Sequence, residues 1–120
     1  MNGKVVVNLS TGLEDAERVL VAFLVGAAAL DQGKEVVFFL TKEAVRLTLP
    51  GVAIGEACTG CPPLEKIFAQ VAEKGGELYA CPFCVSSRGL DDAELVTNAR
   101  VAGATPLWEW IGDGATVFSY

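Results

Sequence analysis

The chain has 120 residues, of which 52% are hydrophobic and 20% are charged, so it fits one packed globular domain and not a disordered segment. Its formal net charge of −6 argues against nucleic acid as a partner, because phosphate binding needs clustered Lys and Arg. The sequence contains no histidine, which excludes Ser-His-Asp and Cys-His catalysis and HExxH metal sites. We therefore expect a single domain over residues 1–120 whose chemistry uses other side chains.

The N-terminal segment and the longest apolar run indicate the cellular compartment that we expect. Residues 1–9 have the pattern of a strand and lack the small-residue cleavage site of a secretion signal. The longest apolar run, residues 19–30, is shorter than the roughly 20 residues that a membrane span needs. We therefore expect a cytoplasmic protein with no membrane partner. In a reducing compartment its four cysteines are more typical of metal ligands or reactive thiols than of permanent disulfides.

The first third of the chain predicts a strand, a helix and a second strand. Residues 5–9 form a continuous apolar run of strand length, as do residues 35–40. Between them, Thr11 and Glu14 have the spacing of a capping box that starts a helix. The helix has no polar residue over residues 19–30, so we predict that it is buried all round. In so short a chain, part of that burial is expected to come from another subunit.

The remaining two thirds continue the alternation of helices and strands. The predicted elements are a short helix from Thr41 to about Leu49, a helix from Pro62 or Pro63 to Gly75, a strand over residues 77–80, a short helical stretch capped by Asp91 that contains Leu95 and Val96, a helix from Thr105 and a strand over residues 115–119. This alternation predicts an α/β fold, with a mostly parallel sheet of four or five strands and helices on both faces.

One cysteine pair stands where a predicted strand passes into a predicted helix. Cys81 and Cys84 form a C-x-x-C motif at the carboxyl end of the strand over residues 77–80, which is the edge where parallel sheets carry their sites. A helix N-terminus there favours a thiolate, and Arg88 adds a cation one turn further on. The pattern indicates a nucleophilic thiol that transfers sulfur or exchanges disulfides. The competing structural interpretation is a pair of buried, inert thiols.

Cys58 and Cys61 form a second C-x-x-C pair, which also precedes a predicted helix. Together the two pairs have a spacing within the zinc-ribbon range, so a zinc site made by Cys58, Cys61, Cys81 and Cys84 is an alternative. Zinc ribbons are built on hairpins, however, whereas each pair here lies at an α/β connection. We therefore predict no cofactor, with zinc as the alternative and with Cys58 and Cys61 as accessory thiols.

The segment that starts at Cys81 resembles a known family. It runs Cys-Pro-Phe-Cys-Val-Ser-Ser-Arg-Gly, with Gly89 eight residues after Cys81, and it is similar to the DsrE/DsrF family of sulfur-relay proteins. The first strand, the long apolar helix and the closing segment 103–119 agree with that family. The resemblance implies a flavodoxin-like or Rossmann-like sheet that assembles into homotrimers or homohexamers. It also implies that Cys81 matches the persulfide-carrying cysteine and that Cys84 matches a second cysteine of some relatives, whereas Cys58 and Cys61 have no counterpart.

The sequence and the resemblance together favour a sulfur carrier. Cys81 would accept sulfane sulfur from a donor and pass it to an acceptor protein or a small thiol, and Cys84 would be a resolving thiol. Two alternatives remain open at this point. One is a zinc-binding structural or interaction module, and the other is a dithiol-disulfide oxidoreductase that needs only one C-x-x-C pair.

Overall fold

The computed structural model describes residues 3–120 and contains one sheet of five strands. The strands are β1 (Lys4–Leu9), β2 (Glu35–Leu40), β3 (Glu77–Ala80), β4 (Ala99–Val101) and β5 (Thr116–Ser119). Their order across the sheet is β4-β3-β2-β1-β5, and every neighbouring pair is parallel. The predicted α/β class and the parallel sheet are therefore confirmed.

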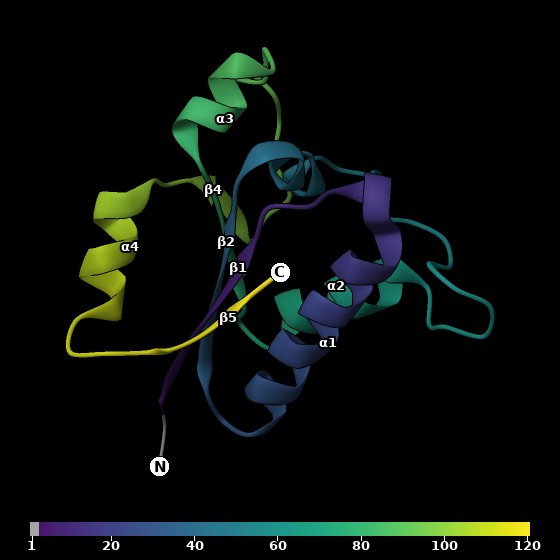
Figure 1. Ribbon diagram of the computed structural model, residues 1–120, viewed down its shortest axis with the longest axis horizontal. Coiled ribbons are helices and arrows are strands. Elements are labelled where there is room, and N and C mark those ends of the chain that lie inside the picture. The colour runs from purple at the N-terminus through teal and green to yellow at the C-terminus, as the bar shows by residue number, and fades with distance from the viewer. Residues whose placement is uncertain (1–2) are drawn as a thin grey trace.

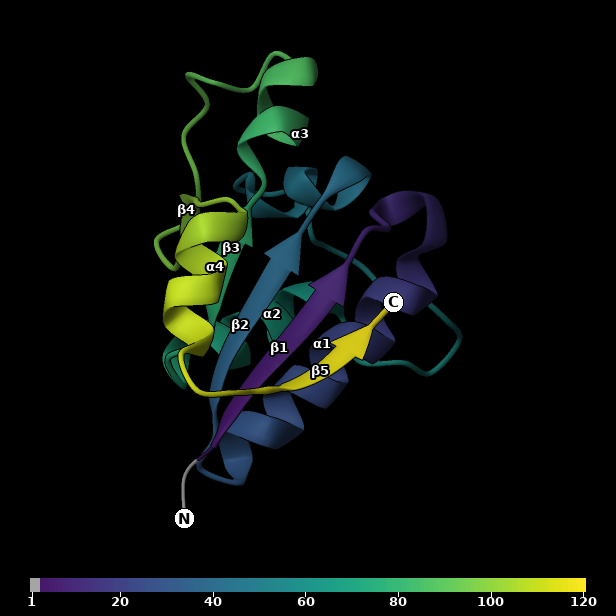
Figure 2. The same cartoon turned by 60° about the vertical axis from the view of Figure 1, so that its left-hand side comes forward.

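Helices cover both faces of the sheet, unequally. They are η1 (Leu13–Asp15), α1 (Ala16–Asp31), η2 (Lys42–Thr48), α2 (Leu64–Glu73), α3 (Pro82–Ser87) and α4 (Ala104–Ile111), where η marks a 3₁₀ helix. Figures 1 and 2 show α1 and α2 side by side on one face and α4 alone on the other. The short helix α3 extends beyond the carboxyl ends of the strands. Within residues 3–120, no helix is both long and apolar enough to cross a lipid bilayer.

The main core lies between the sheet and the α1–α2 layer. Alternate residues of β1 point into it, and Phe23 of α1 stacks on Phe38 of β2 and on Phe68 of α2, with ring centroids 4.2 Å and 3.9 Å apart. Gly26 allows this close packing, because a Cβ atom there would lie only 2.2 Å from the Phe38 ring. The amphipathic spacing that predicted α2 is confirmed, since Leu64, Ile67 and Val71 are buried.

Within the single chain the apolar helix is not buried all round, and the expectation that another subunit completes its burial stays a prediction. In α1, Val21 is 43% exposed and Leu24 is 40% exposed, whereas Val19, Ala22 and Phe23 are fully buried. The absence of polar residues therefore did not mean that this chain covers every side of the helix. An apolar strip remains open along its outer side.

The predicted capping box at the start of this helix is wrong. Asp15 is the N-cap of α1, and its carboxylate accepts the N–H three residues further on. Glu14 instead accepts the N–H of Gly12 at 3.0 Å, and Thr11 caps nothing. Gly12 lies so close to η2 that a Cβ atom would be 2.7 Å from the Glu43 carbonyl oxygen. Gly12 is thus in close contact with η2 just before η1 begins.

The region between α3 and α4 differs most from the prediction. Residues 91–98 form turns and no helix, so the predicted helical stretch capped by Asp91 is wrong. Asp91 accepts a hydrogen bond from Ser86 of α3, and the N–H of Val96 bonds the Thr48 carbonyl at 2.8 Å. These contacts with other elements replace helical hydrogen bonds. The segment then enters the short edge strand β4, which the sequence did not predict.

Candidate functional site

Cys81 stands at the carboxyl end of β3, as predicted. Its N–H donates to the Leu40 carbonyl at 3.0 Å, which extends the ladder between β3 and β2 by one residue. Cys81 is the N-cap of α3, and Pro82 occupies the first helical position. Proline suits that position because its missing N–H has no helical partner there. The strand and the helix therefore both fix the backbone at Cys81.

The helix α3 is held against η2 by a small apolar cluster. Val85 of α3, Val45 of η2 and Ala80 of β3 are buried together, and Cys81 and Cys84 pack at the edge of this cluster. Both cysteines carry free thiols and are partly exposed. The competing interpretation of fully buried, inert thiols therefore does not describe this pair.

The sulfur of Cys84 receives a hydrogen bond from the backbone of η2. The N–H of Lys42 donates to Cys84 Sγ at 3.1 Å. Lys42 has a φ of +55°, and it is the one residue other than glycine with a positive φ within residues 3–120. Left-handed backbone in such a residue costs about 1 kcal/mol or more, and this kind of strain often marks functional sites. The hydrogen bond ties the Cys84 sulfur to the backbone of η2.

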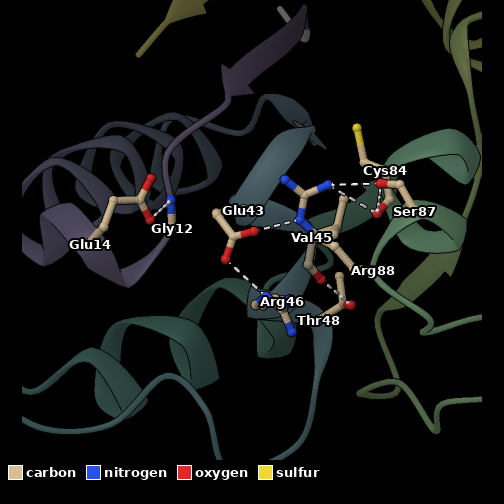
Figure 3. A network of polar contacts seen from close by, with 9 residues as sticks. All are labelled: Gly12, Glu14, Glu43, Val45, Arg46, Thr48, Cys84, Ser87 and Arg88. Carbon is tan, nitrogen blue, oxygen red and sulfur yellow. Dashed lines mark hydrogen bonds and ion pairs between the residues drawn. The ribbon is translucent and has the colours of Figure 1, made fainter.

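Arg88 joins α3 to η2 through Glu43. Its Nε donates to Glu43 Oε2 at 2.5 Å, and Arg46 Nε donates to the other carboxylate oxygen at 2.9 Å. Figure 3 shows Glu43 between the two arginines. The hydrogen bond from Arg88, followed by that from Arg46, holds the pKa of Glu43 below its ordinary value of 4.5. The carboxylate is thus ionised at neutral pH and bridges two elements.

The second contact of Arg88 runs to the backbone of its own helix. Its Nη1 donates to the Cys84 carbonyl at 3.2 Å and to Ser87 Oγ at 3.1 Å. In Figure 3 the Cys84 sulfur points away from this guanidinium. No contact found within residues 3–120 joins Arg88 to either sulfur, so the structure gives Arg88 a positioning role for the cysteine turn.

The surroundings of Cys81 and Cys84 are open to solvent. Phe83, between the two cysteines, is 85% exposed, and Pro82 lies against Gly103 at the start of α4. A cavity of about 310 Å³ is lined in part by Glu43 and Arg46, but its lining includes neither Cys81 nor Cys84. The thiols therefore lie on an accessible edge and not inside that cavity, which suits a partner that presents its own reactive atom.

The other cysteine pair lies elsewhere and is oxidised. Cys58 and Cys61 form a disulfide in the loop between η2 and α2, with Cα atoms 5.2 Å apart. They pack against the main core, whereas Cys81 and Cys84 pack against the cluster around Val85. Figures 1 and 2 show this loop well away from α3. Cys58 and Cys61 therefore differ from the expectation that the cysteines are metal ligands or reactive thiols more typically than disulfides.

The alternative site made by all four cysteines does not form in this structure. Within residues 3–120, no group of three or more His, Cys, Asp or Glu side chains has the arrangement that a metal ion would require. The two pairs belong to different clusters, and one pair is closed by its own S–S bond.

The sequence interpretation missed the part of the site that comes from η2. Lys42 contributes a backbone N–H, and Glu43 contributes the carboxylate that binds Arg88. One signal could have found Glu43. It follows the predicted strand over residues 35–40, and the carboxyl ends of parallel strands lie at one edge of the sheet, the edge that also carries Cys81.

Two curated relatives share moderate sequence identity with the chain. The uncharacterized protein MK0008 of Methanopyrus kandleri is 28% identical over 104 residues, which cover 87% of this chain and 83% of that protein. The uncharacterized protein MJ0760 of Methanocaldococcus jannaschii is 25% identical over 95 residues, which cover 79% of this chain and 34% of that protein.

Solved structures have the same fold at lower identity. The YchN protein of E. coli superposes with a TM-score of 0.80 at 18% identity, and the match covers all of both chains. MTH1491 of Methanobacterium thermoautotrophicum, a protein of unknown function, superposes with a TM-score of 0.74 at 12% identity and covers 98% of this chain and 99% of its own. Residues 3–120 match the DsrE/DsrF-like family. The protein therefore belongs to the DsrE/DsrF-like family.

Proposed function

We propose that the protein is a sulfur-relay protein in which Cys81 carries sulfane sulfur. The observation that carries this proposal is a free, partly exposed thiol at the end of β3, on the N-cap residue of a helix, in a chain that matches the DsrE/DsrF-like family. A thiol in that position is accessible to a partner and lies next to the partial positive charge of a helix N-terminus.

Loading is a transfer of one sulfur atom. The Cys81 thiolate attacks the outer sulfur of a donor persulfide, R–S–SH, and forms a new S–S bond. The donor's S–S bond breaks, and the donor leaves as the thiolate R–S⁻. This thiolate takes up the proton that the Cys81 thiol lost when it ionised. Cys81 then holds Cys–S–SH, and an acceptor thiolate removes the outer sulfur by the same step in reverse. No external oxidant is needed, because the sulfane sulfur passes from one thiol to another with no net change in oxidation state.

Cys84 serves as the resolving thiol. It lies three residues after Cys81 on the same turn, a spacing that brings side chains to about 5–6 Å between Cβ atoms. Its thiolate attacks the inner sulfur of the Cys81 persulfide, forms a Cys81–Cys84 disulfide and releases the outer sulfur as hydrogen sulfide. The Lys42 N–H holds the Cys84 sulfur in place on the side of η2 before this attack.

Arg88 and Glu43 act as positioning residues in this scheme. Glu43 ties α3 to η2 through Arg88, and Arg88 in turn holds the Cys84 carbonyl. Both cysteines therefore keep a fixed relation to the Lys42 N–H on η2 while a partner docks.

The partners of this relay are sulfur donors and acceptors, either proteins or small thiols, in the cytoplasm. We propose that the protein works as a homotrimer or homohexamer. The apolar strip of α1 around Val21 and Leu24, about two fifths exposed in the single chain, supports an assembly that covers it.

Mass spectrometry of the native protein tests the proposal. The protein is purified without chelator and measured before and after incubation with a persulfide donor. We expect an added sulfur atom on wild-type protein, located at Cys81, and no added sulfur on Cys81→Ser. The same spectrum gives the number of subunits.

The matched control is the double variant Cys58→Ser/Cys61→Ser, which removes the other C-x-x-C pair. It should load sulfur as the wild type does. If Cys81→Ser loaded sulfur normally and the control variant did not, the sulfur carrier would be the Cys58–Cys61 pair, and the proposal would be contradicted.

A further inference from the structure

The disulfide between Cys58 and Cys61 lies in a loop of its own, away from the proposed sulfur site. Both side chains are partly buried on the inner side, whereas Thr59 and Gly60 between them are exposed. Cys58 and Cys61 each keep part of their surface exposed, and an attacking thiol would approach the S–S bond from that side.

The backbone holds the two cysteines together without help from the disulfide. The N–H of Cys61 donates to the Cys58 carbonyl at 3.0 Å, which closes a tight turn. Gly60 has a φ of +78°, as such a turn requires, and a Cβ atom there would have no neighbour within 4 Å. The reduced thiols would consequently stay close to each other, and closing the disulfide needs no reorganisation of the chain.

The ends of the loop are anchored by other bonds. Gly55 donates its N–H to Glu65 Oε2 at 2.7 Å, and its carbonyl accepts the N–H of Leu64 at 2.9 Å. Glu56 and Pro63 add an isolated antiparallel bridge. These contacts connect the loop to α2 on either side of the cysteine pair, so opening the S–S bond leaves the loop in place.

The disulfide contributes little as a structural staple. A cross-link between residues three apart closes a very short ring, and the entropy that it removes from the unfolded chain is small. Since the loop is held by other bonds, the cysteine pair is better suited to chemistry than to stability.

We propose that Cys58 and Cys61 form a second thiol–disulfide exchange site, independent of Cys81, whose substrates are dithiols. A thiolate of an external dithiol attacks one sulfur of the pair, breaks the S–S bond and forms a mixed disulfide. The second thiol of the dithiol then attacks that bond and leaves as a cyclic disulfide. The protein pair gains two electrons and two protons, and the external dithiol loses the same. In the reverse reaction the reduced pair attacks an external disulfide, reduces it to thiols and closes its own S–S bond again.

The test uses the folded double variant Cys81→Ser/Cys84→Ser, which retains only the Cys58–Cys61 pair. The variant is equilibrated without denaturant in mixtures of reduced and oxidised dithiothreitol, quenched in acid and alkylated with iodoacetamide. We expect two alkylated thiols at the reducing end of the series and none at the oxidising end. The same curve should be obtained from either starting state, with an unchanged circular dichroism spectrum.

Two outcomes would overturn this proposal. One is a pair that stays bonded in the folded protein at the most reducing ratio, as a structural disulfide does. The other is a reduced pair that fails to close again in the oxidising mixture.

The wild-type protein gives an independent measurement if the double variant does not fold. Trypsin separates the two pairs, because cleavage after Arg46 and Lys66 releases Cys58 and Cys61, and cleavage after Lys74 and Arg88 releases the other pair. Alkylation is then counted for each peptide. Since the first peptide does not report on sulfur loading, failure of exchange here is distinguishable from failure of the sulfur-relay proposal.

Discussion

The two C-x-x-C segments have the same spacing, and both precede a helix, yet they differ in backbone and in chemistry. Between Cys58 and Cys61, the chain makes a tight turn with Gly60 in the left-handed region, and the sulfurs are bonded. Between Cys81 and Cys84, the chain is already helical, and the sulfurs are free. The intervening residues set the difference, because Thr-Gly favours a turn and Pro-Phe starts a helix.

The two cysteine pairs also differ in the hydrogen bonds that surround them. Cys84 accepts an N–H from η2, and its helix is tied to η2 through Arg88 and Glu43. The 58–61 turn is bonded to α2 on either side and has no comparable donor to its sulfurs among the contacts of residues 3–120. One pair is thus two free thiols at the start of a helix, and the other is a disulfide within a turn.

The largest effect that would sharpen this comparison is expected from Cys84→Ser. After loading, wild-type protein should release hydrogen sulfide and end with a Cys81–Cys84 disulfide. The variant should load sulfur and then release almost none, because the persulfide has no thiol beside it. Sulfide is measured colorimetrically, and the loaded mass is followed in the same sample. If Cys84→Ser released sulfide as fast as the wild type, the resolving thiol would have to be sought elsewhere, and Cys58→Ser/Cys61→Ser is the variant that tests the other pair.

A smaller effect, on stability, is expected from Gly60→Ala. The left-handed φ of Gly60 costs an alanine about 1 kcal/mol, so the free energy of unfolding should fall by about that amount. Urea denaturation measures it. The matched control is Phe83→Ala, which replaces the exposed side chain at the middle of the other pair and should leave the unfolding curve unchanged. We also expect Gly60→Ala to close its disulfide more slowly than the wild type. An unchanged free energy of unfolding in Gly60→Ala would show that the left-handed turn is not needed to hold the two cysteines together.

The elements that the sequence predicted well are those with strong local patterns. The amphipathic face of α2 and the apolar runs of β1 and β2 depend on side chains close in sequence, and all three elements are confirmed. The Asp91 stretch failed because a tertiary bond from Val96 to Thr48 outweighs its local helix signals. The edge strand β4, of three residues, is too short to leave a pattern.

In the candidate site, too, the residues of one local motif were predicted and those from another element were missed. Cys81, Cys84 and Arg88 belong to one continuous motif, so the sequence alone brought them together. The contributions of Lys42 and Glu43 depend on β2 lying beside β3 in the sheet, which no local pattern records. The left-handed conformation of Lys42 is equally invisible in the sequence, because lysine carries no preference for it.

The smallest effect is expected from acid, and it should appear at one pair only. The pKa of Glu43 is lowered in the folded protein, chiefly by its hydrogen bond with Arg88, so its stabilising contribution is present above pH 4.5 and is lost as the pH falls through the folded-state pKa. Below pH 4.5, protonation should loosen α3 from η2. Amide hydrogen exchange of α3, corrected for the intrinsic effect of pH, should therefore lose protection over this range.

Two glutamine variants separate this effect from general acid destabilisation. Glu43→Gln should show reduced protection of α3 at neutral pH and a flat response to acid, because its side chain no longer titrates. Glu65→Gln changes a carboxylate that binds the loop of the 58–61 turn and not α3, so it should keep the wild-type response of α3. An acid response in Glu43→Gln equal to that of the wild type would show that a group other than Glu43 causes the loss of protection. The ion pair would then have no part in what distinguishes the two segments.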